Sequence, residues 1–84
     1  MQNDLLVQYG AIRETIRTNI DTIGRLLSQA ENLKNIVDNV NDSDIKDSLQ
    51  NEVEKIQNTV GELIVQTDRL FDKYSEFVKS VFNK

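Results

Sequence analysis

The sequence contains no cysteine, histidine, proline or tryptophan, and it contains only three glycines. Without cysteine the chain can form no disulfide, and without cysteine or histidine it lacks the ligands of a structural zinc site. The same absences remove the usual general base and the thiol nucleophile of hydrolases and transferases. The five serines stand in no nucleophile-elbow motif, and the isolated glycines form no phosphate-binding loop. The composition therefore predicts no enzyme, no cofactor and no small-molecule substrate.

Charge and hydropathy exclude further classes of partner. Acidic residues outnumber basic ones by 14 to 10, so we expect no nucleic-acid partner. Arg13 and Arg17 are flanked by Glu14 and Asp21, which is typical of a solvated helix face with ion pairs. Apolar runs such as Leu63–Val65 are far too short to cross a bilayer, and no basic segment precedes an apolar core at the N-terminus. We therefore expect no membrane insertion and no cleaved signal peptide.

One short acidic stretch has the spacing of a metal-binding loop. Asp42 and Asp44 are spaced like the first two ligands of an EF-hand calcium loop. The pattern then fails at Lys46, at Asp47 where glycine belongs, and at Val53 where a bidentate glutamate belongs. The stretch therefore predicts no metal site.

Apolar residues recur every seven positions in both halves of the chain, as they do at the a and d positions of a heptad repeat. In the first half the a row is Tyr9, Ile16, Ile23, Ala30 and Val37, and the d row is Leu5, Ile12, Asn19, Leu26, Leu33 and Val40. In the second half the a row is Val53, Val60, Thr67, Tyr74 and Val81, and the d row is Leu49, Ile56, Leu63, Leu70 and Phe77. The rows predict helices over about 4–40 and 44–82.

A short turn over residues 41–43 separates the two predicted helices. Asn41, Asp42 and Ser43 are residue types that favour turns, and Ser43 is the predicted N-cap of the second helix. A connection this short makes the helices antiparallel neighbours. We therefore predict an all-α fold, an antiparallel two-helix hairpin of coiled-coil type that forms one domain over residues 1–84.

Two polar residues, Asn19 and Thr67, interrupt the apolar rows. An antiparallel hairpin with this turn pairs residues whose numbers add up to about 85, so both fall at one level. We expect a hydrogen bond between them, which would fix the register of the helices. A ligand site is the alternative interpretation.

Further apolar residues lie beside the a and d rows. The residues predicted to bind a partner occupy e positions or lie close to them, and they are Leu6, Ile20, Leu27, Ile64, Phe71, Val78 and Phe82. Ile36 at a g position and Val65 widen the stripe. A stripe this broad is typical of helices in a bundle of three or more. We therefore expect the hairpin to form a four-helix bundle, either as a homodimer or with a helical protein partner.

Two other features each allow two interpretations. Gly24 and Gly61 both occupy b positions at one level, where another backbone can approach or where surface glycines are simply tolerated. The five aromatic residues gather at the ends of the two helices that lie opposite the turn. They can seal the end of the hairpin, or they can form a docking patch. We predict that this end, and not the acidic turn, binds the partner.

An acidic hairpin of this length, without disulfides and with a mid-chain turn, resembles the WXG-type small proteins of bacterial type VII secretion. It is also similar to the small helical proteins that pair with the N-terminal domains of LXG toxins. The family's Trp-x-Gly turn is replaced by Val40, Asn41 and Asp42, and its export signal, Tyr followed four residues later by Asp or Glu, is Tyr74 and Val78 here. The resemblance therefore carries over no site residue.

The resemblance implies a partner subunit or targeting chaperone that binds a larger helical toxin or secreted substrate. It also implies a place in the bacterial cytoplasm, or export without a cleaved signal peptide. A stand-alone bundle protein is the alternative function: an immunity protein, an antitoxin or a phage-encoded regulator that acts by occlusion. A neighbouring gene for a large toxin with a long helical N-terminus would favour the secretion partner.

Overall fold

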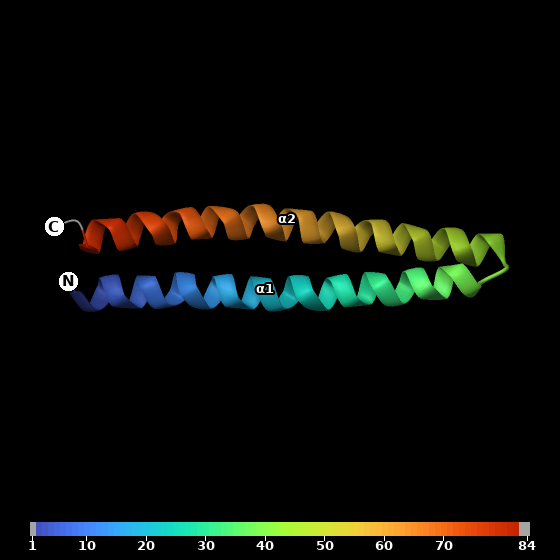
Figure 1. The fold of residues 1–84 in the computed structure, drawn as a ribbon, viewed down its shortest axis with the longest axis horizontal. Helices are drawn as coiled ribbons and strands as arrows, with labels where there is room; N and C mark the ends of the chain where they lie inside the picture. The colour runs from blue at the N-terminus through green and yellow to red at the C-terminus, as the bar shows by residue number, and fades with distance from the viewer. Residues whose placement is uncertain (1, 83–84) are drawn as a thin grey trace.

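The chain folds into two long helices joined by a three-residue turn. The computed structural model describes residues 2–82, and the side chains of all of them except residues 2, 3 and 5. Helix α1 spans Gln2–Asn39 and helix α2 spans Ser43–Phe82, and the two lie side by side as a hairpin (Figure 1). The Cα atoms extend over 63 × 16 × 14 Å. The all-α, antiparallel two-helix hairpin predicted from the heptads is therefore confirmed.

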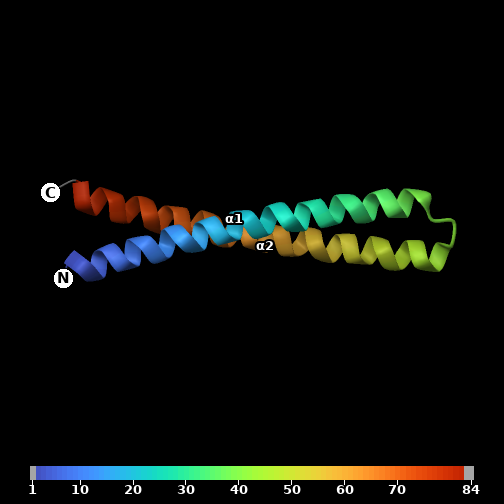
Figure 2. The ribbon, with the colours of Figure 1, turned by 90° about the horizontal axis from the view of Figure 1, so that it is seen from below.

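The hairpin has two different ends. The turn closes one end, which we call the tip, while the start of α1 and the end of α2 lie together at the other, which we call the open end (Figure 1). In the view turned by 90° about the long axis of the hairpin, the two helices cross at a shallow angle (Figure 2). Such winding is expected where the apolar pattern repeats every 3.5 residues and the helix every 3.6.

The helix boundaries lie within two residues of the predicted ones. Helix α1 begins at Gln2, ahead of the predicted residue 4, and ends at Asn39. Helix α2 begins at Ser43 and ends at Phe82. The turn is therefore 40–42 and not 41–43.

The N-cap of α2 is Asp42, so the prediction of Ser43 was wrong. The Oδ1 atom of Asp42 accepts hydrogen bonds from the backbone N–H groups of Asp44 at 2.9 Å and Ile45 at 3.1 Å. The Asp42 carbonyl accepts the bond from the N–H of Lys46 at 3.0 Å. A carboxylate reaches two donors and also places its negative charge at the positive end of the helix, so it is preferred over the neighbouring hydroxyl.

The seam between the helices is built from the predicted rows. The buried residues are all at a positions, and they are Ile16, Ala30, Val37, Val53, Val60 and Thr67. The described d residues are half-buried. In a heptad the a row lies between the d row and the e row, so apolar e residues shield it from one side.

At the open end the predicted rows terminate with Leu5 in α1 and Val81 in α2. The side chain of Leu5, the first d residue, lies outside the described part of the structure. Val81, the last a residue, was predicted in the seam but is 49% exposed. It lies at the open end, where the seam terminates and few neighbours remain to cover it.

Candidate docking surface

The e positions of α1 and α2 lie on the same side of the seam, as they must in an antiparallel pair. A shallow depression of about 360 Å³ near the tip demonstrates this arrangement. Its lining includes Lys34 from α1 and Gln50 and Gln57 from α2, all at e positions, together with Val37, Val53 and Glu54. Near the tip, e residues of both helices therefore line one shallow depression.

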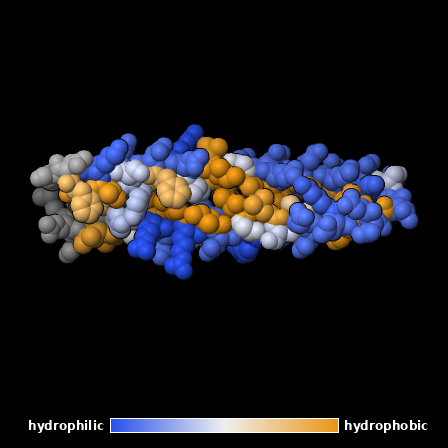
Figure 3. All heavy atoms as spheres, viewed as in Figure 1, coloured by the Kyte–Doolittle hydropathy of each residue, from blue (hydrophilic) through white to orange (hydrophobic). Residues whose placement is uncertain are grey.

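The seven residues predicted to bind a partner line this side of the hairpin. We call them the apolar face: Leu6, Ile20, Leu27, Ile64, Phe71, Val78 and Phe82. All are exposed except Val78, which is half-buried, and Phe82 is the most exposed of them at 80%. Figure 3 shows apolar surface over the half of the rod nearest the open end and into its middle, with hydrophilic surface over most of the tip half.

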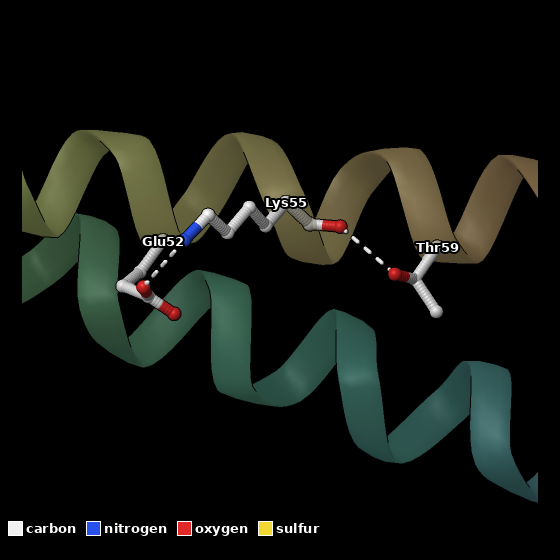
Figure 4. Close-up of polar contacts among 3 residues, drawn as sticks. All are labelled: Glu52, Lys55 and Thr59. Atoms are coloured by element: carbon white, nitrogen blue, oxygen red, sulfur yellow. Dashed lines mark hydrogen bonds and ion pairs between the residues drawn. The ribbon is translucent and has the colours of Figure 1, made fainter.

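The opposite side of the seam, at the g positions, is polar along most of its length. Glu52 and Thr59 lie there, and their contacts stay within α2 (Figure 4). The Nζ atom of Lys55 lies 3.4 Å from Oε1 of Glu52, and the Thr59 hydroxyl donates to the Lys55 carbonyl at 3.0 Å. Ile36 and Ile45 are the exposed apolar residues at g positions, and both are near the tip. The two sides of the hairpin therefore differ in chemistry.

Two arginines stand on or beside the apolar face without the ion pairs expected from the sequence. The pair between Lys55 and Glu52 is the one ion pair in the described part of the chain, so Arg13 and Arg17 form none with Glu14 or Asp21. Arg13 is at an e position and Arg17 at the adjacent b position. Their charges are therefore available to a second molecule.

The predicted hydrogen bond between Asn19 and Thr67 is absent from the described residues. The buried Thr67 hydroxyl instead donates to the carbonyl of Leu63, one turn earlier in α2, at 2.6 Å. Threonine commonly forms this bond inside helices, which leaves it no donor for a partner across the seam. Asn19 is half-buried, and no buried side-chain polar atom among the described residues lacks a partner, so its amide reaches solvent. Asn19 and Thr67 are therefore two polar residues of the seam that form no hydrogen bond with each other.

Replacing Asn19 by leucine is therefore expected to raise the free energy of unfolding by about 1 kcal/mol, because it extends the apolar row without leaving Thr67 unpaired. The shift is measured by urea unfolding followed by circular dichroism. Thr18→Leu, at the exposed neighbouring position, is the control and is expected to change the midpoint little. A large loss of stability in Asn19→Leu would mean that the amide has a partner the fold requires.

The five aromatic residues at the open end divide into two groups. Tyr9, Tyr74 and Phe77 close the seam, with ring centroids 4.9 Å apart for the two tyrosines and 5.4 Å apart for Tyr9 and Phe77. Phe71 and Phe82 remain exposed on the apolar face. Three rings therefore seal the open end of the hairpin, and the docking interpretation stays a prediction for the two exposed rings.

The hydroxyl groups of Tyr9 and Tyr74 form a hydrogen bond across the seam. This bond raises the pKa of Tyr74 above its ordinary value, partial burial and the nearby Tyr9 add to the rise, and the charge of Arg13 opposes it. The Tyr74 phenol therefore keeps its proton at neutral pH. The bond ties the two helices together at the level where α1 and α2 would otherwise fray.

Within residues 2–82 no three acidic side chains gather where they could hold a metal ion. Neither α1 nor α2, over the residues described, contains a stretch long and apolar enough to cross a membrane. Comparison of the chain with protein-family models, curated proteins and solved structures finds no match.

Proposed function

We propose that the chain is a protein–protein interaction module, and that its apolar face binds helices of another chain to complete a four-helix bundle. One observation carries the proposal: six large apolar side chains along one side of a two-helix rod are exposed, while the other side is mostly polar. Monomeric proteins rarely leave so much contiguous apolar surface in water. The hairpin itself uses only its a and d rows.

The open end supplies the largest contacts of the proposed interface. Phe71 and Phe82 lie outside the seam, and aromatic side chains provide much of the binding energy of protein interfaces. The tip is less suited to binding, because Asp42 is already occupied in capping α2. A role as a type VII partner subunit, which binds a helical toxin or secreted substrate, is the specific form of this proposal and rests on the resemblance alone.

Removing the two exposed rings tests the proposal. The variant Phe71→Ala with Phe82→Ala is expected to bind its partner at least tenfold more weakly, because each ring fills part of the interface. The helices should remain intact by circular dichroism, because neither ring packs in the seam. Binding is measured by capture from bacterial lysate followed by titration with the purified partner.

A matched control is available on the same helices. Val7 and Val65 are 69% and 51% exposed, but both occupy f positions, on the side of their helices away from the seam. The variant Val7→Ala with Val65→Ala should capture the partner as the unchanged chain does. If the phenylalanine variant still captures the partner while Asp44→Asn with Asp47→Asn does not, the binding surface is the tip and the proposal is wrong.

A further inference from the structure

We infer that the apolar face is completed by a second copy of this chain, with the two hairpins parallel and their open ends together. The inference rests on the proposed function and names its partner. A two-fold axis along the rod brings α1 of one copy against α2 of the other. Residues of the two helices that lie at the same level of one hairpin therefore face each other across the interface. The inference follows from how well these residues match. Each helix then has two antiparallel neighbours, the usual up-down arrangement of four-helix bundles.

The e rows match under this operation at the three levels nearest the open end, and at the next level Leu27 meets the polar Gln57. Leu6 of one copy meets Val78 of the other, because both lie at the same level of the hairpin. One level further from the open end, Arg13 faces the ring of Phe71, where a guanidinium can stack on the aromatic face. Ile20 then meets Ile64 in the middle of the rod. All three contacts join side chains that suit each other.

The b rows, which border the e rows, match as well. Arg17 faces Asp68 across the interface, and neither side chain has an ion pair within the described part of its own hairpin. On one side of this pair Gly24 faces Gly61, and on the other Gly10 faces Ser75. In each b row a charged residue therefore stands between two small residues, and the charged residues of the two rows have opposite charges and lie at the same level.

The glycines have no role inside the hairpin that explains them. A Cβ atom added to Gly10, Gly24 or Gly61 would meet nothing within 4 Å. Glycine inside a helix is unfavourable relative to alanine. Small residues in facing positions allow two helices to approach closely, so the second copy accounts for glycines that the isolated hairpin does not need.

The antiparallel alternative lacks this match. It would turn the open end of one copy onto the tip half of the other, where the e positions are Lys34, Gln50 and Gln57. Phe71 would then face polar side chains. The parallel arrangement keeps the apolar surface of both copies together in the open half. It also brings Glu31 and Glu54 of the tip halves near each other, so the tips should splay apart.

The area available is enough for a weak dimer. A large apolar side chain has about 200 Å² of accessible surface when it is fully exposed. Taken with the exposed fractions of the apolar face, this gives on the order of 600 Å² of accessible apolar surface per copy. Polar atoms of the rim bring this near the roughly 800 Å² per partner of a standard interface. We therefore expect association at micromolar concentration.

Spin labels at the tip test the orientation. The chain has no cysteine, so Asn41→Cys, in the turn and outside the cap, labels one site per copy. Parallel hairpins place the two labels about 20 to 30 Å apart, from the spacing of packed helices. Antiparallel hairpins would separate them by about 60 Å or more, from the rise along each helix. A long distance in a dimer overturns the inference and leaves the proposed function standing.

Exchange of the rim charges tests the contact itself. Arg17→Glu and Asp68→Arg should each raise the dissociation constant about tenfold, because two like-charged pairs replace two attractive ones. The double variant should return it close to the original value. Sedimentation velocity over a concentration series measures all three. The control is Lys73→Glu, a charge reversal on the polar side of the hairpin, which should leave the dissociation constant within about twofold.

The outcomes separate this inference from the proposed function. A chain that stays monomeric at about 100 micromolar, well above the concentration expected for this area, overturns the inference but leaves the face free for a different helical partner. Failure of the double variant to restore association overturns the assigned contact. A dimer that is unchanged by Phe71→Ala with Phe82→Ala would contradict both the inference and the proposed surface.

Discussion

Replacing Val60 by aspartate is expected to unfold the hairpin. Val60 is 6% exposed at an a position in the middle of the seam, where a carboxylate would find no cation or donor. Burying an unpaired charge costs about 3 to 5 kcal/mol. That cost is similar to the entire stability of a small domain, about 5 kcal/mol. The expected result is loss of the helical circular dichroism signal without denaturant, or a urea midpoint close to zero.

Val65→Asp is the matched control for this experiment. Val65 lies five residues further along α2 and is 51% exposed at an f position. The substitution is the same, so the difference in helix propensity is the same and only burial differs. This variant should remain folded, with a free energy of unfolding within about 1 kcal/mol of the original. Equal midpoints for the two variants would show that the seam has been assigned to the wrong row.

The seam could be predicted from the sequence because only one pattern of burial is open to two long helices. Apolar residues at every a and d position except Asn19 and Thr67 form one stripe that a second helix can cover, and the short turn fixes the direction of that helix. The buried a residues, such as Ile16 and Val53, follow directly from this constraint. The exposure of Val81 could not be predicted, because the heptad pattern does not show at which residue the two helices stop covering each other.

The local polar contacts were harder to predict, because neighbouring groups compete for the same donors. Asp42 and Ser43 are both good N-caps, and the sequence alone does not show which one adopts the capping conformation. The Thr67 hydroxyl had two possible acceptors, and it donates to the carbonyl of Leu63 in its own helix. Both contacts form within α2 or at its start, where the heptad pattern gives no information about side-chain hydrogen bonds.

The exposed apolar side of the hairpin could be predicted in part, and its role in docking stays a prediction. The e-position residues follow from the heptad register, and the structure adds that all but Val78 are exposed and share one side of the rod. The charged residues at the rim, Arg17 and Asp68, were not selected as site residues. Their b positions were visible in the register, but their proposed role in a dimer depends on their having no ion-pair partner among the described residues of the hairpin.

Replacing Gly24 and Gly61 by alanine together is expected to raise the free energy of unfolding of the isolated hairpin by about 2 kcal/mol. Each glycine lies inside a helix, where alanine is favoured by about 1 kcal/mol. Apart from the backbone of the adjoining turns of the same helix, nothing lies within 4 Å of the added Cβ, so the gain should not be offset by a clash. Urea unfolding at a protein concentration well below that of association measures the effect. Ser28→Ala, at an exposed f position, controls for a general gain in helix propensity.

The same double substitution should weaken association of two copies. The methyl groups would stand where Gly24 of one copy faces Gly61 of the other, so the helices could no longer approach as closely and the apolar contacts on either side would loosen. A more stable hairpin that dimerises less well is the expected signature, because the glycines lower the stability of the monomer and contribute only when the second copy is present. Sedimentation velocity gives the second half of this comparison. A variant that is stabilised and still dimerises with the original dissociation constant would show that the two glycines are tolerated surface residues, and that the closest approach of the two copies lies elsewhere on the apolar face.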